Sequence, residues 1–559
     1  MTTRDEEKGS KMEVPESSEV GELVIGGNSD GLHRKLNNRQ IQLVAIGGSI
    51  GTALFVSIGL GLAKGGPGSL LIAFTLYSLV LACVNNSVAE MTVLMPVSGG
   101  FIRLAGHWVD DALGFMAGWN FFLYEALLIP FEITAINLVL SFWNEGITEP
   151  GPTAAICAVV IVLYAMINVL AVRAYGEAEF WLSGGKVILL FLLFFYTFVT
   201  MVGGNPENDA YGFRYWNDPG AFAEYNGAKG DLGRFQGFLG SLWSAAFAIV
   251  GPEYVSMVAA EAQRPRIFIK TAFKTIYWRF GLFFFGSALC VGIVVPYNYP
   301  DLVSILTGSS GSGTAAASPY VMSMKILHVH GLSHLVNALM LTSIFSAGNT
   351  YTYCATRSLY GLALEGRAPR FLRKTWSNGV PIYCFCVVMV FPLLSFLQVG
   401  HGSKKVVGWL VDLITAGGII DFLVMNVTFL YYYRACNAQG VDRSALPYYG
   451  RFQPYGTYIA LFVQTLVAIF YGYTSFTPWS AENFFRNYTM QLLAPILFFG
   501  WKFLKRTRTV QPHEADLVWE RPNIDRYEAS FTDPPVGFWT EMGQLVGLRK
   551  ENKRRAMVS

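Results

Sequence analysis

The chain has 559 residues, of which 53% are hydrophobic, 15% aromatic and only 14% charged, and its mean hydropathy is +0.39. Soluble domains carry roughly a quarter charged residues, so this composition excludes an ordinary soluble protein and indicates a membrane protein. A net charge of +3 gives no reason to expect nucleic acid as a partner. The seven cysteines lack redox or zinc spacing, so no disulfide framework, metal or cofactor is expected.

Twelve apolar runs approach the length of about 20 residues that a helix needs to cross a bilayer. They cover residues 41–63, 69–93, 112–141, 153–172, 184–203, 238–260, 275–296, 332–356, 381–399, 406–430, 456–474 and 488–504. These runs predict an all-α integral membrane protein with twelve transmembrane helices. The predicted organisation is a tail over residues 1–37, a twelve-helix domain over 38–505 and a second tail over 506–559.

Basic residues are concentrated in alternate connections between the runs. One set of connections is rich in arginine and lysine, as at Arg264, Arg266 and Lys270, and both tails belong with this set. The other set is sparse or mixes its basic residues with acidic ones. Because basic connections tend to face the cytoplasm, both termini are predicted to be cytoplasmic.

The first apolar run contains Val44–Phe55, which holds three glycines within five residues. One interpretation is a face of small residues that lets two membrane helices pack closely. The other is a helix that breaks at mid-membrane and exposes backbone dipoles to a small ligand. This stretch alone does not decide between the two interpretations.

A second break is predicted in the sixth run, where Gly251 and Pro252 precede the carboxylate of Glu253. Proline removes a backbone donor and clashes with the preceding turn, and a charged side chain within the membrane is a functional candidate. A simple proline kink with a satisfied glutamate is the alternative. The two breaks occupy matching positions if runs 1–5 and 6–10 are repeats, and such paired breaks point to a transporter binding site.

The two breaks also suggest the ligand. Exposed N–H groups at the start of a half-helix favour a carboxylate, and exposed carbonyl groups at the end of a half-helix favour a cation. A broken helix that offers both suits a zwitterion, which indicates an α-amino acid.

An ordered set of short motifs resembles the fungal amino-acid permeases of the yeast amino acid transporter family, within the amino acid–polyamine–organocation superfamily. The likeness covers roughly residues 35–525 and rests on Gly48-Ser-Ile-Gly-Thr-Ala-Leu-Phe55, Ala89-Glu-Met91, Pro96-Val-Ser-Gly-Gly-Phe101, Gly118-Trp-Asn120, Gly251-Pro-Glu253, Ser346-Ala-Gly-Asn349, Arg357-Ser-Leu359 and Leu364-Glu-Gly-Arg-Ala-Pro369. Two further stretches, Glu125-Ala-Leu-Leu-Ile-Pro-Phe-Glu132 and Asp516-Leu-Val-Trp-Glu520, are similar to the dicarboxylic amino-acid permease group.

This resemblance implies a five-plus-five inverted repeat with helices 1 and 6 broken, plus two extra helices. It also implies proton-coupled uptake across the plasma membrane by alternating access, with acidic amino acids as the expected substrates. The substrate-binding residues that it implies are Gly48, Ser49, Gly51, Thr52, Ala53, Phe247, Val250 and Gly251. Among these, Thr52 is expected to meet the substrate carboxylate, Phe247 stands where relatives have an aromatic gate, and Ala53 departs from the more usual glycine.

Proton coupling is assigned to three buried charged residues, Lys186, Glu253 and Glu132. Lys186 matches a position where a lysine replaces a sodium ion in some relatives, which favours a proton over sodium. A snorkelling lysine is the alternative. Glu90, Glu125 and Asp421 also fall within apolar runs, as proton carriers or as structural hydrogen-bond partners.

Other readings of the chain stay open. A permease for neutral amino acids or proline is the alternative on substrate, and a non-transporting amino-acid sensor is the alternative from another class. No channel filter, metal set or nucleophile–base set indicates a channel or an enzyme. The expected partners are the substrate, a proton and the lipid bilayer. Lys8, Lys11 and the cluster Arg549–Arg555 are candidate ubiquitin or anionic-lipid contacts, or simply solvated tails.

Overall fold

The computed structural model describes residues 34, 36–170, 172–307, 318–376, 380–401, 403–476 and 478–545. Over these residues the regular secondary structure is helical, apart from two isolated β-bridges. Ten segments are long and apolar enough to cross a membrane, beginning with Ala53–Leu94 and ending with Tyr455–Ser475. The expected all-helical membrane protein is therefore confirmed. Lys8, Lys11 and the cluster 549–555 lie outside the described residues.

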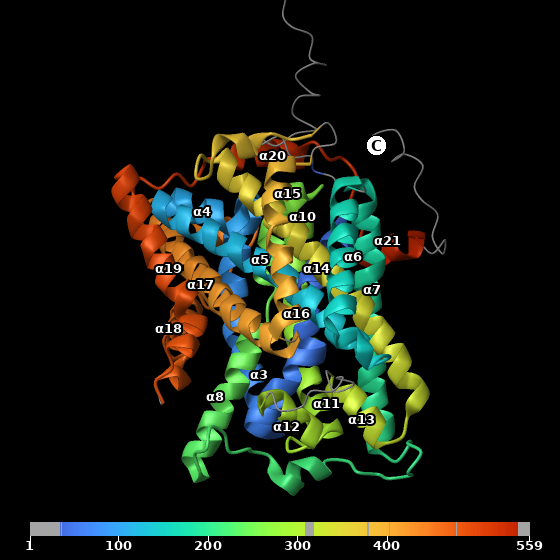
Figure 1. Ribbon diagram of the computed structural model, residues 1–559. Coiled ribbons are helices and arrows are strands. Elements are labelled where there is room, and N and C mark those ends of the chain that lie inside the picture. The colour runs from blue at the N-terminus through green and yellow to red at the C-terminus, as the bar shows by residue number, and fades with distance from the viewer. Residues whose placement is uncertain are drawn as a thin grey trace, which may run out of the picture.

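The helices form one bundle, and the connections between them lie at its two ends (Figure 1). The longer elements are α2 Asn38–Ser49, α3 Ile58–Leu94, α5 Asp111–Leu140, α6 Pro150–Leu170, α7 Val172–Met201, α8 Gly230–Ala248, α10 Pro265–Arg279, α14 His330–Leu364, α17 Ser403–Ala438, α18 Tyr455–Phe470 and α19 Ala481–Lys505. The shorter ones are α4 Gly100–Trp108, α9 Pro252–Met257, α11 Gly286–Val294, α12 Pro300–Thr307, α13 Pro319–Ile326, α15 Ile382–Val388, α16 Gln398–His401, α20 Arg521–Ala529 and α21 Phe538–Leu545. We call the end that carries α4 and α20 the α20 side, and the end that carries α12 and α13 the α12 side.

The first helix breaks at Ile50 and Gly51. The side chain of Asn37 caps the start of α2, and α2 ends at Ser49 because Ile50 adopts an extended conformation, with φ −117° and ψ 106°. The chain resumes in a π-helical turn, Ala53–Ser57, that leads into α3. The broken-helix interpretation of the glycine-rich stretch is thereby confirmed.

Within α3 the chain reverses direction at Gly66, where φ is +78°. A Cβ atom added at Gly61 would lie 2.8 Å from the side chain of Leu70. Nine residues of continuous helix would separate these two positions by about 13 Å, so the contact shows that the two arms fold back on each other. Glycine is needed at the turn, because a Cβ on Gly66 would also lie 2.8 Å from the carbonyl oxygen of Ala221.

The second break follows α8. Ile249 is extended and Gly251 has φ +153°, after which α9 starts at Pro252. Pro252 suits the first turn of a helix because the N–H that it lacks has no partner there. The predicted interruption at Gly251 and Pro252 is confirmed, and it ends one half-helix and begins another.

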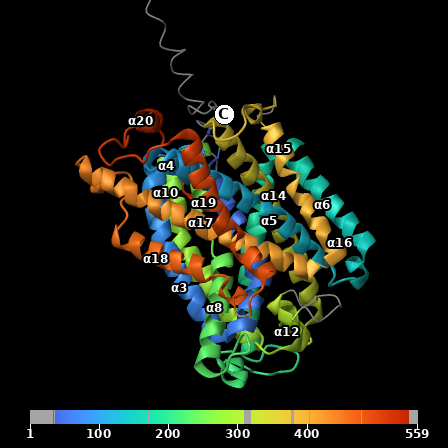
Figure 2. The ribbon, with the colours of Figure 1, turned by 60° about the vertical axis from the view of Figure 1, so that its left-hand side comes forward.

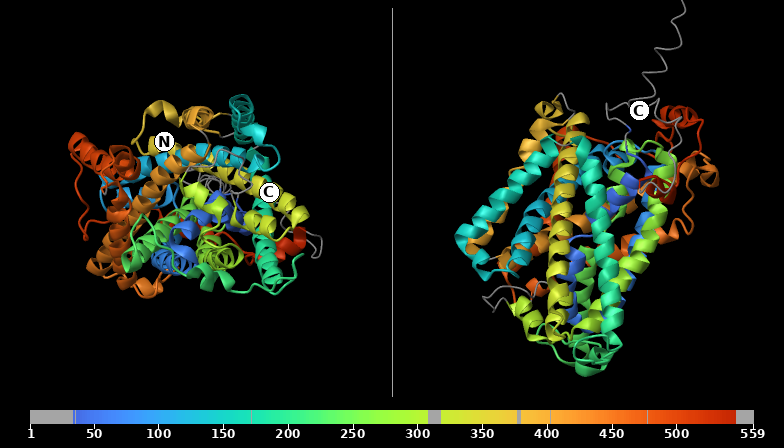
Figure 3. Two further views of the ribbon diagram at one scale, coloured as in Figure 1. Left: turned by 60° about the horizontal axis from the view of Figure 1, so that its bottom comes forward. Right: turned by 90° about the vertical axis from the view of Figure 1, so that its right-hand side faces the viewer.

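Long helices hold the two breaks in place. The helices α5 and α17 cross near the centre of the bundle, and α14 packs along α5 (Figures 1 and 3). The helix α2 packs against α7, and α8 packs against α3. Both breaks thus lie inside the bundle, where irregular backbone is tolerated because protein surrounds it.

The helices α18 and α19 lie at the edge of the bundle against α17 (Figure 2). The glycosylation sequon at Asn487 falls in the second turn of α19. The side chain of Asn487 is buried and donates a hydrogen bond to Ser475 Oγ at 3.0 Å. The amide is therefore not presented to solvent in the way that a glycan requires.

Residues 509–545, which we call the C-terminal strap, lie across the α20 side. The indole of Trp519 stacks on His107 with 3.9 Å between ring centroids. The Tyr527 hydroxyl donates to the carbonyl of Gln263 at 2.8 Å, and Arg264 donates to the carbonyl of Asp533 at 2.7 Å. The strap therefore contacts the segment that directly follows the second broken helix.

Candidate functional site

A small cavity of about 20 Å³ lies between the two breaks. It is lined by Gly51, Ala53, Tyr124, Leu128, Phe131, Glu132, Phe247, Ala248, Val250 and Tyr351. This space holds about one water molecule. The lining comes from the first break, α5, the second break and α14, so four separate parts of the chain build the site.

The first break contributes Gly51, Thr52 and Ala53. A Cβ atom at Gly51 would lie 3.1 Å from Ala347 Cβ and 3.1 Å from Glu132 Oε1, so the backbone approaches the cavity as closely as glycine allows. Thr52 is buried, and its hydroxyl donates a short hydrogen bond to Glu132 Oε2. Gly48 and Ser49 are the last two residues of α2, where the carbonyl groups of a helix lack intrahelical partners; their side chains lie outside the description.

The second break contributes Phe247 and Val250 to the cavity lining. The Phe247 ring packs edge-to-face on Phe131, with 5.4 Å between ring centroids and an interplanar angle of 87°. The N–H of Gly251 donates to Glu253 Oε2 at 3.1 Å. Glu253 therefore hydrogen-bonds the backbone of the break without lining the cavity, whereas Phe247 lines it.

Lys186 lies on α7, which packs against α2. Its side chain is 1% exposed and interacts electrostatically with Glu132. The predicted coupling residues Lys186 and Glu132 thus lie near each other and near the first break. Glu253 lies apart from this pair, on the second break.

A family model described as amino acid permease matches residues 40–514. The chain belongs to the amino acid permease family. It is therefore a transporter and not an enzyme, and its substrates are amino acids. The region matched extends from the start of α2 into the C-terminal strap.

Among the relatives of this permease, a general amino acid permease of Saccharomyces cerevisiae is 42% identical over 504 residues, which are 89% of this chain and 83% of the relative. A proline-specific permease of Emericella nidulans is 35% identical, with 88% of this chain and 89% of the relative covered. A dicarboxylic amino acid permease of Saccharomyces cerevisiae is also 35% identical, over 89% of this chain and 81% of the relative. These relatives show the class of substrate but not the amino acid that this permease carries.

The permease site includes residues that sequence reasoning missed, namely Tyr124, Leu128, Phe131, Ala248 and Tyr351. Positions 124, 128, 131 and 132 share one face of α5 because their spacing matches the helical period. That stripe could have been found from Glu132. Tyr351 comes from α14, and no local pattern distinguishes it from the other aromatic residues of that helix.

Glu90 has a structural role in the permease. Arg443 donates to its two carboxylate oxygens at 2.6 and 2.8 Å, and the N–H of Gly450 donates to it at 2.9 Å. The pair ties α3 to the segment between α17 and α18, on the α20 side. Of the two readings of Glu90, the structural hydrogen-bond partner is the one that these contacts support.

Glu125 and Asp421 lie deeper in the permease. Asn120 donates to Asp421 Oδ1 at 2.9 Å. Glu125 is completely buried within electrostatic range of Glu253 and Asp421. Neither acid is among the residues that line the central cavity.

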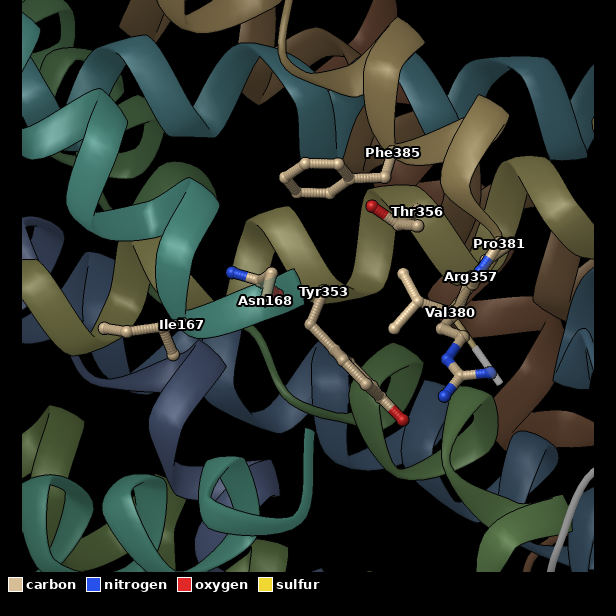
Figure 4. Close-up of a pocket in the computed structure, with 8 residues that line it drawn as sticks. All are labelled: Ile167, Asn168, Tyr353, Thr356, Arg357, Val380, Pro381 and Phe385. Carbon is tan, nitrogen blue, oxygen red and sulfur yellow. The ribbon is translucent and has the colours of Figure 1, made fainter. Parts of the chain in front are cut away.

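A separate small cavity lies on the α20 side of the permease, between α6, α14 and the start of α15 (Figure 4). Its lining includes Tyr353 and Arg357, whose polar groups lie close together in Figure 4. The Tyr353 hydroxyl donates to both carboxylate oxygens of Glu261, at 3.0 and 2.9 Å, and Arg357 Nε lies 3.9 Å from Glu261 Oε1. We call these three residues the Glu261 latch, since they join α14 to the segment after the second break.

Proposed function

We propose that the chain imports amino acids across the plasma membrane by proton symport. The observation that carries the proposal is the hydrogen bond between Thr52 and Glu132 at the edge of the cavity. It joins the residue expected to bind the substrate carboxylate to a residue that can hold a proton.

The proposed transmembrane organisation has twelve spans. The turn at Gly66 divides Ala53–Leu94 into parts of the first two spans, and α19 supplies the twelfth. In this arrangement spans 1–5 and 6–10 form two repeats, each opening with a broken helix. Matching breaks in two repeats are typical of transporters that bind substrate at the bilayer midplane.

The proposed orientation places the α20 side in the cytoplasm. Arg264 and Arg266 lie on this side with Arg443, and basic connections favour the cytoplasmic face. Residues 1–37 and 506–559 would then be cytoplasmic tails around the domain 38–505.

The substrate would bind through its amino-acid backbone. Its carboxylate would meet Thr52 and the N–H groups of Gly51 and Ala53, and its ammonium would meet carbonyl groups at Gly48, Ser49, Phe247 and Val250. This division follows from the dipoles of the half-helices, which are positive at their starts and negative at their ends. The cavity of about 20 Å³ must widen for this to occur, as expected of a site that is closed on both sides.

Glu132 would couple the proton to the substrate. When it is ionised, Glu132 takes the Thr52 hydroxyl and repels an incoming carboxylate across a region of low dielectric constant. When it is protonated, the repulsion ends and Thr52 becomes available to the substrate. When Glu132 is ionised, Lys186 would receive its proton or balance its negative charge. Glu253 would stabilise the backbone of the second break.

Alternating access would use one closure on each side of the cavity. Phe247 covers it toward the α12 side, and the Glu261 latch joins helices toward the α20 side. Opening one closure while the other stays shut would carry substrate from one face to the other.

Acidic amino acids are the proposed substrates, supported by the dicarboxylic relative. Among the described residues that line the central cavity, none is cationic. A binding partner for the second carboxylate must therefore lie outside this cavity.

The test is uptake of labelled glutamate and alanine into yeast that lacks its own amino-acid permeases. Aspartate, glutamate, proline and arginine are added as competitors, with and without a protonophore. Inhibition by acidic amino acids together with loss of uptake on collapse of the proton gradient supports the proposal. Uptake that is insensitive to the protonophore contradicts the symport, and competition by proline alone contradicts the acidic substrate.

A further inference from the structure

A second cavity, of about 140 Å³, lies between the central cavity and the α12 side. Its lining comes from the first span, α8, α17, α19 and the loops on that side, and includes Lys64, Trp243, Phe247, Asp412, Tyr471 and Arg486. We call it the outer cavity. It holds several water molecules, whereas the central cavity holds about one.

Phe247 lines both cavities. Because its ring packs edge-to-face on Phe131, the two aromatic side chains form the wall between them. A molecule in the outer cavity is therefore one side chain away from the central site. Aromatic rings also form the outer walls, where Trp243 packs edge-to-face on Tyr471.

Three charged side chains face the outer cavity, and two of them are cations. Arg486 Nε lies 2.6 Å from Asp412 Oδ2, and the Tyr471 hydroxyl donates to Asp412 Oδ1 at 3.3 Å. Among the described residues Lys64 forms no ion pair. It interacts electrostatically with Asp412 at longer range, and its ammonium lies 5.8 Å from the ring centre of Tyr225. The cavity thus has one more positive charge than negative, and Lys64 supplies it.

The position of Lys64 is determined by packing. A Cβ atom added at Gly240 would lie 2.9 Å from both Cβ and Cδ of Lys64, so the lysine stem lies directly on the glycine of α8. The stem is held while the ammonium, which has three donors and no ion-pair partner, remains available to an acceptor. A held ammonium beside aromatic walls is a suitable site for a carboxylate.

We propose that the outer cavity binds the side-chain carboxylate of an acidic amino acid through Lys64, before the substrate passes Phe247. This inference rests on the proposed function and deepens it, because it supplies the cationic partner that the central cavity lacks. Asp412 forms its ion pair with Arg486 and interacts with Lys64 only at longer range, so Lys64 is the group that receives the anion. A cleft with a net charge and walls of low dielectric constant concentrates ligands of the opposite charge, by roughly tenfold or more where one sign lines it throughout.

The test compares the KM values for glutamate and alanine in uptake by the full chain. In Lys64→Gln the ratio of the glutamate KM to the alanine KM rises about tenfold, because only glutamate loses an ionic contact. Lys64→Arg keeps the charge and restores most of the ratio. The matched control is Lys229→Gln, which removes a lysine on the same side whose side chain is 87% exposed and paired with Glu224; it leaves the ratio unchanged.

Ionic strength provides a second measurement that does not depend on a variant. Salt screens an unpaired ammonium, so the glutamate KM of the native chain rises with ionic strength while the alanine KM does not. An unchanged ratio in Lys64→Gln, or an equal rise for both substrates, overturns the outer site and leaves proton-coupled uptake standing. If the native chain takes up no amino acid at all, the proposed function itself fails.

Discussion

At the scale of single residues, the site depends on the contact between Thr52 and Glu132. Sequence reasoning predicted both residues but assigned them separate tasks, one to the substrate and one to the proton. The structure brings them within hydrogen-bond distance across two helices that are 80 positions apart in the chain. The contact between Thr52 and Glu132 depends on how α5 packs against the first break. No local pattern in either segment predicts it.

Glu132→Gln is expected to separate binding from coupling. Glutamine can still accept from Thr52, but it cannot exchange a proton, so the ratio of uptake at external pH 5 to uptake at pH 7.5 falls to about one. Exchange of labelled for unlabelled amino acid across proteoliposomes persists. Thr52→Ser serves as the control, since it keeps the hydroxyl and the pH dependence. A glutamine variant that still accumulates substrate against a gradient at pH 5 contradicts the coupling role.

Lys186→Ala is expected to change the pH profile of uptake more than the KM. The ammonium is buried and interacts with Glu132, so removing it leaves the carboxylate without its nearby positive charge. A buried carboxylate without a cation is costly and holds its proton more tightly. The pH of half-maximal uptake should therefore move upward by about one unit. An unmoved profile in proteoliposomes would remove Lys186 from the mechanism.

At the scale of elements, both breaks followed from glycine and proline, because these residues act locally on the backbone. The π-helical turns at Ala53–Ser57 and Phe280–Phe285 did not follow from the sequence. Neither did the exact turn at Gly66. Those features depend on neighbours from other parts of the chain, such as Ala221, which lies far from Gly66 in sequence.

Gly66→Ala is expected to destabilise the turn between the first two spans. Gly66 combines a positive φ with an extended ψ, a conformation essentially confined to glycine that costs a residue with a Cβ roughly 1–3 kcal/mol, and the contact with Ala221 adds to this. Folded protein after detergent extraction should fall severalfold, as measured by fluorescence-detected size-exclusion chromatography. Gly331→Ala, where an added Cβ meets nothing within 4 Å, is the matched control and should behave like the native chain. Equal yields for the two variants would contradict this role of the turn.

At the scale of the whole molecule, the C-terminal strap meets segments that lie far apart in the chain. Leu36, which precedes α2, accepts from the N–H of Gln263 and donates to the carbonyl of Glu261, both at 2.9 Å. Tyr527 of the strap contacts the same Gln263. The start of the first broken helix, the segment after the second broken helix and the strap therefore meet beside the Glu261 latch. Sequence reasoning predicted a tail over residues 506–559 but not these contacts, because each of them depends on a partner from another part of the chain.

The attachment of the strap is expected to weaken in acid. Burial and the nearby Arg103 lower the pKa of His107, which stacks on Trp519, although Asp516 opposes the shift. Because the pKa is lower in the packed state, the contact is favoured above the ordinary pKa of about 6.5 and weakens as the pH falls below it. Limited proteolysis should cleave residues 509–545 several times faster at pH 5.5 than at pH 7.5. In His107→Phe, which stacks without titrating, the two rates should agree.

The strap also determines where a tag can be fused to this protein without removing structural contacts. The helix α19 ends at Lys505, and a fluorescent protein or affinity tag would ordinarily be joined just beyond it. A fusion at that point would remove the hydrogen bonds of Tyr527 and Arg264 from the segment that follows the second break. Tags therefore belong after residue 545, and an activity measured on a chain shortened to residue 505 describes a permease that lacks these contacts.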